Sequence, residues 1–315
     1  MADESDDYEG LWAKYFDSKQ DVELPNGDTF RAYRAGSQGP HIVLLHGGGY
    51  TSMTWCLVAA LLKEQYTVHA FDLRGHGQTR TSRDEAKTDG DAAAENPQTV
   101  IVGHSLGGAL AVRVAATSKV PSLVGVMVID VVEGTALASL KHMGVILEKR
   151  PSRFRSYKDA IQWALHSGMV RNPEAADVSI PSQLRTLEEG SLVDTCLMLL
   201  VDWFIGLSEQ FLGLKEAKIL VLAGSDRLDT ALVRGQMMGK FEMRIMYGSG
   251  HAIQEDCPDQ VATAIMEFSG RCARTLSGSI FGVNGASRQP NKDQILAERL
   301  AKARAMVPKE GIHHD

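Results

Sequence analysis

Short runs of apolar residues recur along the chain and alternate with stretches of helical periodicity. Such runs are typical of strands that are buried on both faces of a parallel sheet, with helices between them. The stretches "TWCLVAALLKEQ" and "GALAVRVAATSK" predict crossover helices after the first and third runs. The pattern therefore predicts an α/β fold with a mostly parallel central sheet flanked by helices. The predicted strands lie within residues 41–49, 66–77, 98–108, 123–130, 217–226 and 243–252.

The strand-like runs stop between residues 131 and 216, where helical stretches replace them. We interpret this interval as a helical cap inserted over the carboxyl edge of the sheet. Upstream of the first run, alternating residues around Pro25–Asp28 predict a β-hairpin. The expected organisation is an acidic lead-in at 1–20, an α/β domain at 21–270 that includes the cap, and a tail at 271–315 with one helix at 291–306.

Composition is that of a soluble globular protein, with 44% hydrophobic and 23% charged residues. A net charge of −6 without a basic cluster disfavours nucleic acid as a partner. The most apolar window, residues 191–207, is shorter than the roughly 20 residues of a membrane span. Asp194 and Asp202 interrupt it, so we expect a buried helix there and no membrane association. An acidic start without a secretory signal, and four cysteines without a CxxC pair, favour a cytoplasmic or nuclear protein with reduced thiols.

The segment Gly103-His104-Ser105-Leu106-Gly107 fits the pattern G-x-S-x-G and joins an apolar run to a helical one. A nucleophile elbow needs small residues two positions before and after its serine, because the chain turns sharply from strand to helix there. The alternative is a glycine-rich turn with an inert serine, which the strand-to-helix context disfavours. Ser105 is therefore the predicted nucleophile.

The loop Gly47-Gly48-Gly49, after the first predicted parallel strand, is the second element of such a site. An oxyanion hole consists of backbone N–H groups that point at the developing charge of a tetrahedral intermediate. The N–H of Leu106 is one candidate donor, and the glycine loop supplies the other. Gly48 is the first choice and Gly49 the second. The alternative is a plain strand-to-helix turn.

His251 is the predicted general base, because it follows the last apolar run, precedes a helix and is the only late histidine outside the tail. Its position agrees with the chain order serine, acid, histidine that accompanies this type of elbow. His76 and His104 are interpreted as structural.

Two regions could supply the acid that orients His251. Asp130 ends the run "LVGVMVID", and Asp226 and Asp229 follow the run at 217–226 in "LAGSDRLD". Both loops lie at the same edge of a parallel sheet, so either carboxylate could reach the far nitrogen of His251. Position alone favours Asp226, because the acid most often follows the penultimate strand.

Longer segments carry a more specific signal than these motifs. They include "HGGGYTSMTW", "DLRGHGQT", "VIDVVEGTA", "DWFIGLSEQFL", "LAGSDRLDTALVRGQMMGKFEMRIM" and "GHAIQEDCPDQVA". Together they closely resemble the protein phosphatase methylesterase family, roughly over residues 10–268. Members of this family are α/β-hydrolases that demethylate the C-terminal leucine of the type-2A protein phosphatase catalytic subunit.

The resemblance implies a triad of Ser105, Asp130 and His251, and it leaves Asp226 as a loop or pocket residue. Ester hydrolysis through an acyl-enzyme needs no metal or organic cofactor. The implied partner is the phosphatase catalytic subunit, and the chain itself is expected to be a monomer. Two departures stand out, a polar crossover at 78–98 and a divergent cap. The alternatives are a carboxylesterase of small esters and a catalytically weak hydrolase scaffold that binds a partner.

Overall fold

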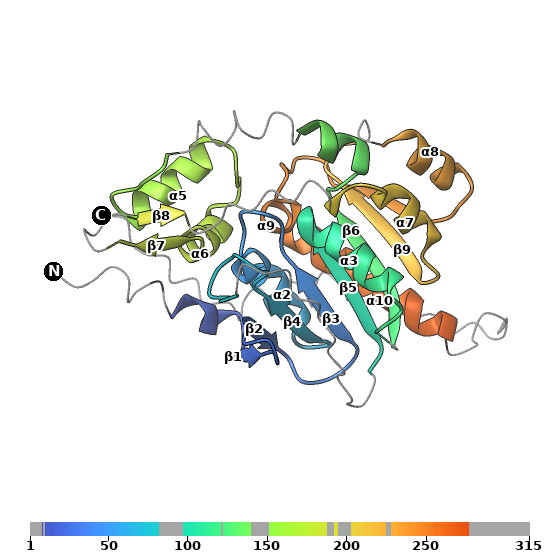
Figure 1. The fold of residues 1–315 in the computed structure, drawn as a ribbon, viewed down its shortest axis with the longest axis horizontal. Coiled ribbons are helices and arrows are strands. Elements are labelled where there is room, and N and C mark those ends of the chain that lie inside the picture. The colour runs from blue at the N-terminus through green and yellow to red at the C-terminus, as the bar shows by residue number, and fades with distance from the viewer. Residues whose placement is uncertain are drawn as a thin grey trace, which may run out of the picture.

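The computed structural model describes residues 8, 10–81, 97–120, 122–139, 151–187, 192–194, 203–224 and 228–276. Its centre is an eight-stranded sheet with the strand order β1-β2-β4-β3-β5-β6-β9-β10 (Figure 1). The strands are β1 (Ser18–Glu23), β2 (Thr29–Ala35), β3 (His41–Leu45), β4 (Thr67–Phe71), β5 (Thr99–His104), β6 (Leu123–Ile129), β9 (Ala217–Leu222) and β10 (Glu242–Ile245).

Six of these strands, from β4 across to β10, pair in parallel, which confirms the predicted sheet. The antiparallel pairs β1–β2 and β2–β4 lie at one edge. The hairpin predicted around Pro25–Asp28 joins β1 to β2, and Leu24 donates its N–H to the Asp28 carbonyl there. The parallel order brings the carboxyl ends of β3, β5, β6 and β10 to one edge, where the candidate site lies.

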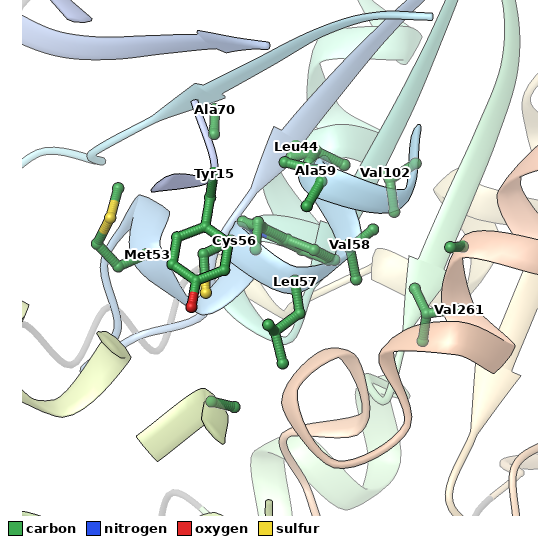
Figure 2. Packing of buried hydrophobic residues seen from close by; sticks show 14 of the residues in the cluster. Tyr15, Leu44, Met53, Cys56, Leu57, Val58, Ala59, Ala70, Val102 and Val261 are labelled. Carbon is green, nitrogen blue, oxygen red and sulfur yellow. The ribbon is translucent and has the colours of Figure 1, made fainter. Parts of the chain in front are cut away.

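Helices cover both faces of the sheet. Alternate residues of β5 face opposite cores, with Val100 and Val102 in one hydrophobic cluster and Ile101 in the other. The first core packs under α2 (Cys56–Leu62) and α10 (Pro258–Leu276), and Figure 2 shows Tyr15 of the lead-in among its side chains. Phe16 is buried in the same core. The second core packs under α3 (Leu106–Ala116) and α7 (Leu207–Gly213). Apolar runs without polar alternation are thus explained by strands covered on both sides.

The interval expected to be a helical cap contains helices and a small ribbon. Figure 1 shows α5 (Tyr157–His166) and α6 (Pro173–Ser182) grouped with the antiparallel pair β7 (Leu184–Thr186) and β8 (Leu192–Asp194). The window expected to be a buried helix begins with β8, because short apolar runs do not distinguish strand from helix. Helix α7 packs on the sheet beside α3.

Further short elements include η1 (Leu11–Lys14), η2 (Ser52–Trp55), α8 (Thr230–Met237) and α9 (Ile253–Asp256). Helix α10 continues beyond residue 270 to Leu276. Several features singled out in the sequence lie outside the described residues: Asp226, most of the acidic start, most of the polar crossover, residues 195–202 of the apolar window and the tail helix. In the part of the chain that the structure describes, no helix is long and apolar enough to cross a membrane.

Candidate active site

Ser105 lies at the turn between β5 and α3, with φ 50° and ψ −118°. A positive φ is strained for a residue with a side chain, and such strain persists where the surrounding structure imposes it. The flanking glycines explain how the turn closes. A Cβ on Gly103 would lie 2.1 Å from the Gly107 carbonyl oxygen, and one on Gly107 would lie 2.3 Å from that of Leu45. The backbone geometry of the predicted elbow is therefore present.

His251 and Asp130 meet across the end of the sheet. The Asp130 carboxylate, directly after β6, accepts a hydrogen bond from His251 Nδ1 with a distance of 2.7 Å to Oδ2. Its other oxygen accepts the N–H of Ala223 at 3.2 Å. The Asp130 side chain is fully buried, while that of His251 is 48% exposed. Because the carboxylate accepts at Nδ1, this nitrogen carries the proton and Nε2 is free to accept one.

Two other acidic side chains of the family-like segments, Asp229 and Glu133, have different partners. Asp229 caps α8 by accepting the N–H of Leu232 at 2.9 Å, and it also accepts the Ser208 hydroxyl at 2.5 Å. Glu133 accepts the N–H groups of Gly206 at 2.9 Å and Ser208 at 3.0 Å. Glu133 therefore holds the start of α7, and Asp229 caps α8 and contacts α7. None of these contacts involves His251.

The glycine loop after β3 passes directly beside the elbow. A Cβ on Gly47 would lie 3.1 Å from Ser105 Cβ, and one on Gly48 would lie 3.8 Å from Leu106 Cδ2. The N–H of Gly49 donates to His76 Nε2 at 3.2 Å and is thereby engaged. The N–H of Leu106, in the first turn of α3, has no acceptor within its own helix. These contacts favour Gly48 over Gly49 as the partner of Leu106 in an oxyanion hole.

The side chains of His46 and His76 hydrogen-bond to the Gly47–Gly49 loop and hold it in place. His46 is fully buried, and its Nε2 accepts the N–H of Leu73 at 2.8 Å while Nδ1 lies 2.8 Å from the Gly47 carbonyl. Burial holds the pKa of His46 well below its usual range, so the ring is neutral and both contacts persist. His46 was not among the residues predicted from the sequence, although its place directly before the three glycines was a possible signal. His76, interpreted as structural, supports the same loop.

The overall arrangement is shared with proteins of known structure. The alpha/beta hydrolase family matches residues 42–264. A solved E-2-(acetamidomethylene)succinate hydrolase aligns with a TM-score of 0.63 at 20% identity, over 80% of this chain and 98% of that one. An esterase of M. tuberculosis aligns with a TM-score of 0.60 at 22% identity, over 79% of this chain and 91% of that one. The fold is that of an α/β-hydrolase, as predicted.

Curated relatives define a narrower group. Protein phosphatase methylesterase 1 of Mus musculus is 38% identical, over 82% of this chain and 83% of its own length. A probable protein phosphatase methylesterase 1 of Caenorhabditis elegans is 42% identical, over 82% of this chain and 77% of its own length. The chain belongs to the protein phosphatase methylesterase family. Membership confirms the resemblance seen in the sequence and makes the chain a carboxylic ester hydrolase.

In this methylesterase-family chain, the loop that carries His251 is tied to the cap. Asp256 accepts the N–H of Gly250 at 2.6 Å and the N–H of Arg171 at 2.7 Å. Arg171 Nη1 in turn donates to the Gly248 carbonyl at 2.8 Å. A carboxylate that accepts two backbone N–H groups restrains both segments. The start of α6 and the His251 loop are therefore held in one arrangement.

Glu255 lies in α9, which follows the His251 loop; its side chain is fully buried and accepts a hydrogen bond from the Thr54 hydroxyl at 2.5 Å. Burial raises the pKa of Glu255 to about 8, from 4.5 in the unfolded chain. The folded state therefore binds one more proton than the unfolded state between these pH values. We expect the free energy of unfolding to fall as pH rises through this window, by on the order of 5 kcal/mol, and to level off above it.

Urea denaturation at pH 5 and pH 8.5 measures this dependence in the wild type and in Glu255→Gln, which keeps the acceptor for Thr54. The variant should be more stable than the wild type at pH 8.5 and nearly equal to it at pH 5. Glu64→Gln, at an exposed position, is the matched control. Parallel stability curves for wild type and Glu255→Gln would show that Glu255 is ionised in the folded protein throughout.

The described residues thus include a strained serine at the elbow, a histidine hydrogen-bonded to a buried carboxylate, and a glycine loop beside the elbow whose backbone N–H groups are candidate oxyanion donors. Such a set can carry out acyl transfer from an ester without further groups. Among the described residues, no three histidine, cysteine, aspartate or glutamate side chains are grouped so that they could hold a metal ion.

Proposed function

We propose that the chain removes the methyl ester from the C-terminal leucine of the type-2A protein phosphatase catalytic subunit. The observation that carries the proposal is the 38–42% identity to methylesterases over 82% of the chain. The names of these relatives describe demethylation of a protein phosphatase, and the candidate site has the groups that ester hydrolysis needs.

In the proposed reaction, Ser105 Oγ attacks the ester carbonyl as His251 Nε2 takes its proton. Asp130 holds the imidazole in the required tautomer and stabilises the imidazolium that forms. The N–H groups of Gly48 and Leu106 bind the oxyanion of the tetrahedral intermediate.

The imidazolium then protonates the departing methoxide, and methanol leaves an acyl-enzyme on Ser105. His251 next activates a water molecule, which attacks the acyl carbonyl. Collapse of the second tetrahedral intermediate releases Ser105 and a free C-terminal carboxylate. The methyl ester oxygen departs with methanol, so the two half-reactions balance.

Comparison of two substrates tests the proposal. The chain should hydrolyse the methylated phosphatase catalytic subunit with a kcat/KM at least about 100-fold above that for a p-nitrophenyl ester, because only the protein makes contacts remote from the ester. Turnover of the small ester alone would replace the proposal with a carboxylesterase of small esters. Binding of the phosphatase with no turnover of either substrate would identify a scaffold.

A further inference from the structure

His104, directly before Ser105, contacts the backbone of the proposed base. The side chain is fully buried, and its Nε2 lies 2.8 Å from the carbonyl oxygen of His251. The two imidazole rings lie 4.7 Å apart between centroids. A carbonyl oxygen only accepts, so His104 Nε2 must carry the proton of this hydrogen bond. His104 therefore donates a hydrogen bond to the main chain of His251, and Asp130 orients the ring of the same residue.

Gln254 favours the tautomer that this contact requires. Its Nε2 lies 3.3 Å from His104 Nδ1 and donates to Thr54 Oγ1 at 2.7 Å. The Thr54 hydroxyl donates its hydrogen bond to Glu255 Oε1, so Thr54 Oγ1 is the acceptor in the contact with Gln254. The amide of Gln254 therefore presents a donor to Nδ1, and Nδ1 must accept. The proton of His104 is left on Nε2, where the His251 carbonyl lies.

Burial also keeps His104 uncharged. It lowers the pKa of His104 to about 3, and the nearby charge of His251 acts in the same direction. A neutral ring can donate to the His251 carbonyl without placing a second positive charge beside the imidazolium that forms during turnover. The titratable groups near the His104 ring include His251, Asp130, His46 and Tyr50.

We propose that His104 is a positioning residue for His251, and that Gln254 fixes the tautomer through which it acts. Asp130 sets the rotation of the His251 ring, while His104 sets the place of its backbone relative to the elbow. His104 and Ser105 are consecutive, so the hydrogen bond from His104 holds the backbone of His251 at a fixed distance from the nucleophile. The inference rests on the proposed role of His251 as base.

Two substitutions at residue 104 separate positioning from packing. His104→Leu removes the donor at similar size, whereas His104→Gln can place an amide N–H near the position of Nε2. We expect kcat to fall roughly 10–100-fold in His104→Leu with KM within about twofold, because small displacements of a catalytic group have effects of this size. His104→Gln should recover most of kcat. His166→Leu, at an exposed position on α5, is the matched control and should match the wild type.

Rates are measured with a p-nitrophenyl ester and divided by the fraction of sites that a fluorophosphonate titrates, so that misfolded protein does not count. A wild-type rate per titrated site in His104→Leu, or no recovery in His104→Gln, would overturn the proposal. Failure on the methylated phosphatase alone would instead bear on the proposed substrate.

A spectroscopic measurement tests the tautomer without activity. In ¹⁵N-labelled protein, long-range nitrogen–proton correlations should show His104 as the Nε2–H tautomer across pH 6–8. Gln254→Leu removes the donor to Nδ1 and should populate the other tautomer, with a partial loss of kcat. An Nδ1–H tautomer in the wild type would contradict the proposal even if both His104 variants failed to fold.

Discussion

Replacement of Ser105 by alanine is expected to lower kcat by roughly 10⁵-fold while the protein stays folded. Alanine lacks the oxygen that forms the acyl-enzyme, so the remaining rate can come only from the oxyanion hole and from bound water. The smaller side chain also fits the elbow, because the close contacts there involve Gly103 and Gly107 rather than the serine oxygen. Stability should therefore change little, although the backbone strain at φ 50° remains.

Steady-state rates and fluorophosphonate labelling measure this effect together. The wild type should be labelled at one serine and lose activity in proportion, and Ser105→Ala should not be labelled. Ser122→Ala offers a matched control, because Ser122 lies at the opposite end of the sheet, where its carbonyl accepts the N–H of Thr99 at the start of β5. Labelling of Ser105→Ala at another serine with residual turnover would place the nucleophile elsewhere.

Replacement of Asp130 by asparagine is expected to lower kcat by roughly 10⁴-fold with KM almost unchanged. Asparagine keeps an oxygen for the N–H of Ala223 but presents an amide donor to His251 Nδ1. The imidazole must then carry its proton on Nε2, where it can no longer accept the proton of Ser105. Activity is lost because His251 adopts the wrong tautomer, so the protein should remain folded.

Two controls decide the identity of the acid. Asp229→Asn should keep near-wild-type activity, because asparagine also caps helices and Asp229 is bonded to Leu232 and Ser208. Asp226→Asn should retain a measurable fraction of the rate. Loss of turnover in Asp226→Asn with survival in Asp130→Asn would reverse the assignment and make Asp226 the acid.

Local patterns were sufficient to predict the elbow and its surroundings. Ser105 and the glycines around it are dictated by backbone sterics within a few residues, so the sequence alone reveals the turn. The parallel sheet was equally accessible, because β3, β5 and β6 are apolar on both faces.

The choice of acid and the supports of the site depend on contacts between distant segments. Both Asp130 and Asp226 follow predicted strands at the same edge; position alone favours Asp226, and the family resemblance favours Asp130. Only the fold brings Asp130 to 2.7 Å from His251, across 121 positions of the chain. His104 was interpreted as structural for the same reason, since its partner is the carbonyl of a residue 147 positions away.

Buried polar networks were the least visible from the sequence. Glu255 lies in the polar segment "QEDCPD", where charge predicts exposure, yet α9 buries it against Thr54. Similarly, the apolar window at 191–207 predicts a helix, but its residues Leu192–Asp194 pair with Leu184–Thr186 as a strand, while residues 195–202 lie outside the described part of the chain. In both cases tertiary contacts override the local signal.

The most direct test of the account follows the methyl group itself. Methylated phosphatase catalytic subunit is incubated with the wild-type chain or with Ser105→Ala. The mass of the C-terminal peptide of the phosphatase is then measured over time by mass spectrometry. We expect the wild type to remove the mass of one methylene from the terminal leucine peptide and to release one methanol per peptide, and we expect no change with Ser105→Ala. A methyl ester that persists with fully folded wild type, or that disappears equally with Ser105→Ala, would contradict the account.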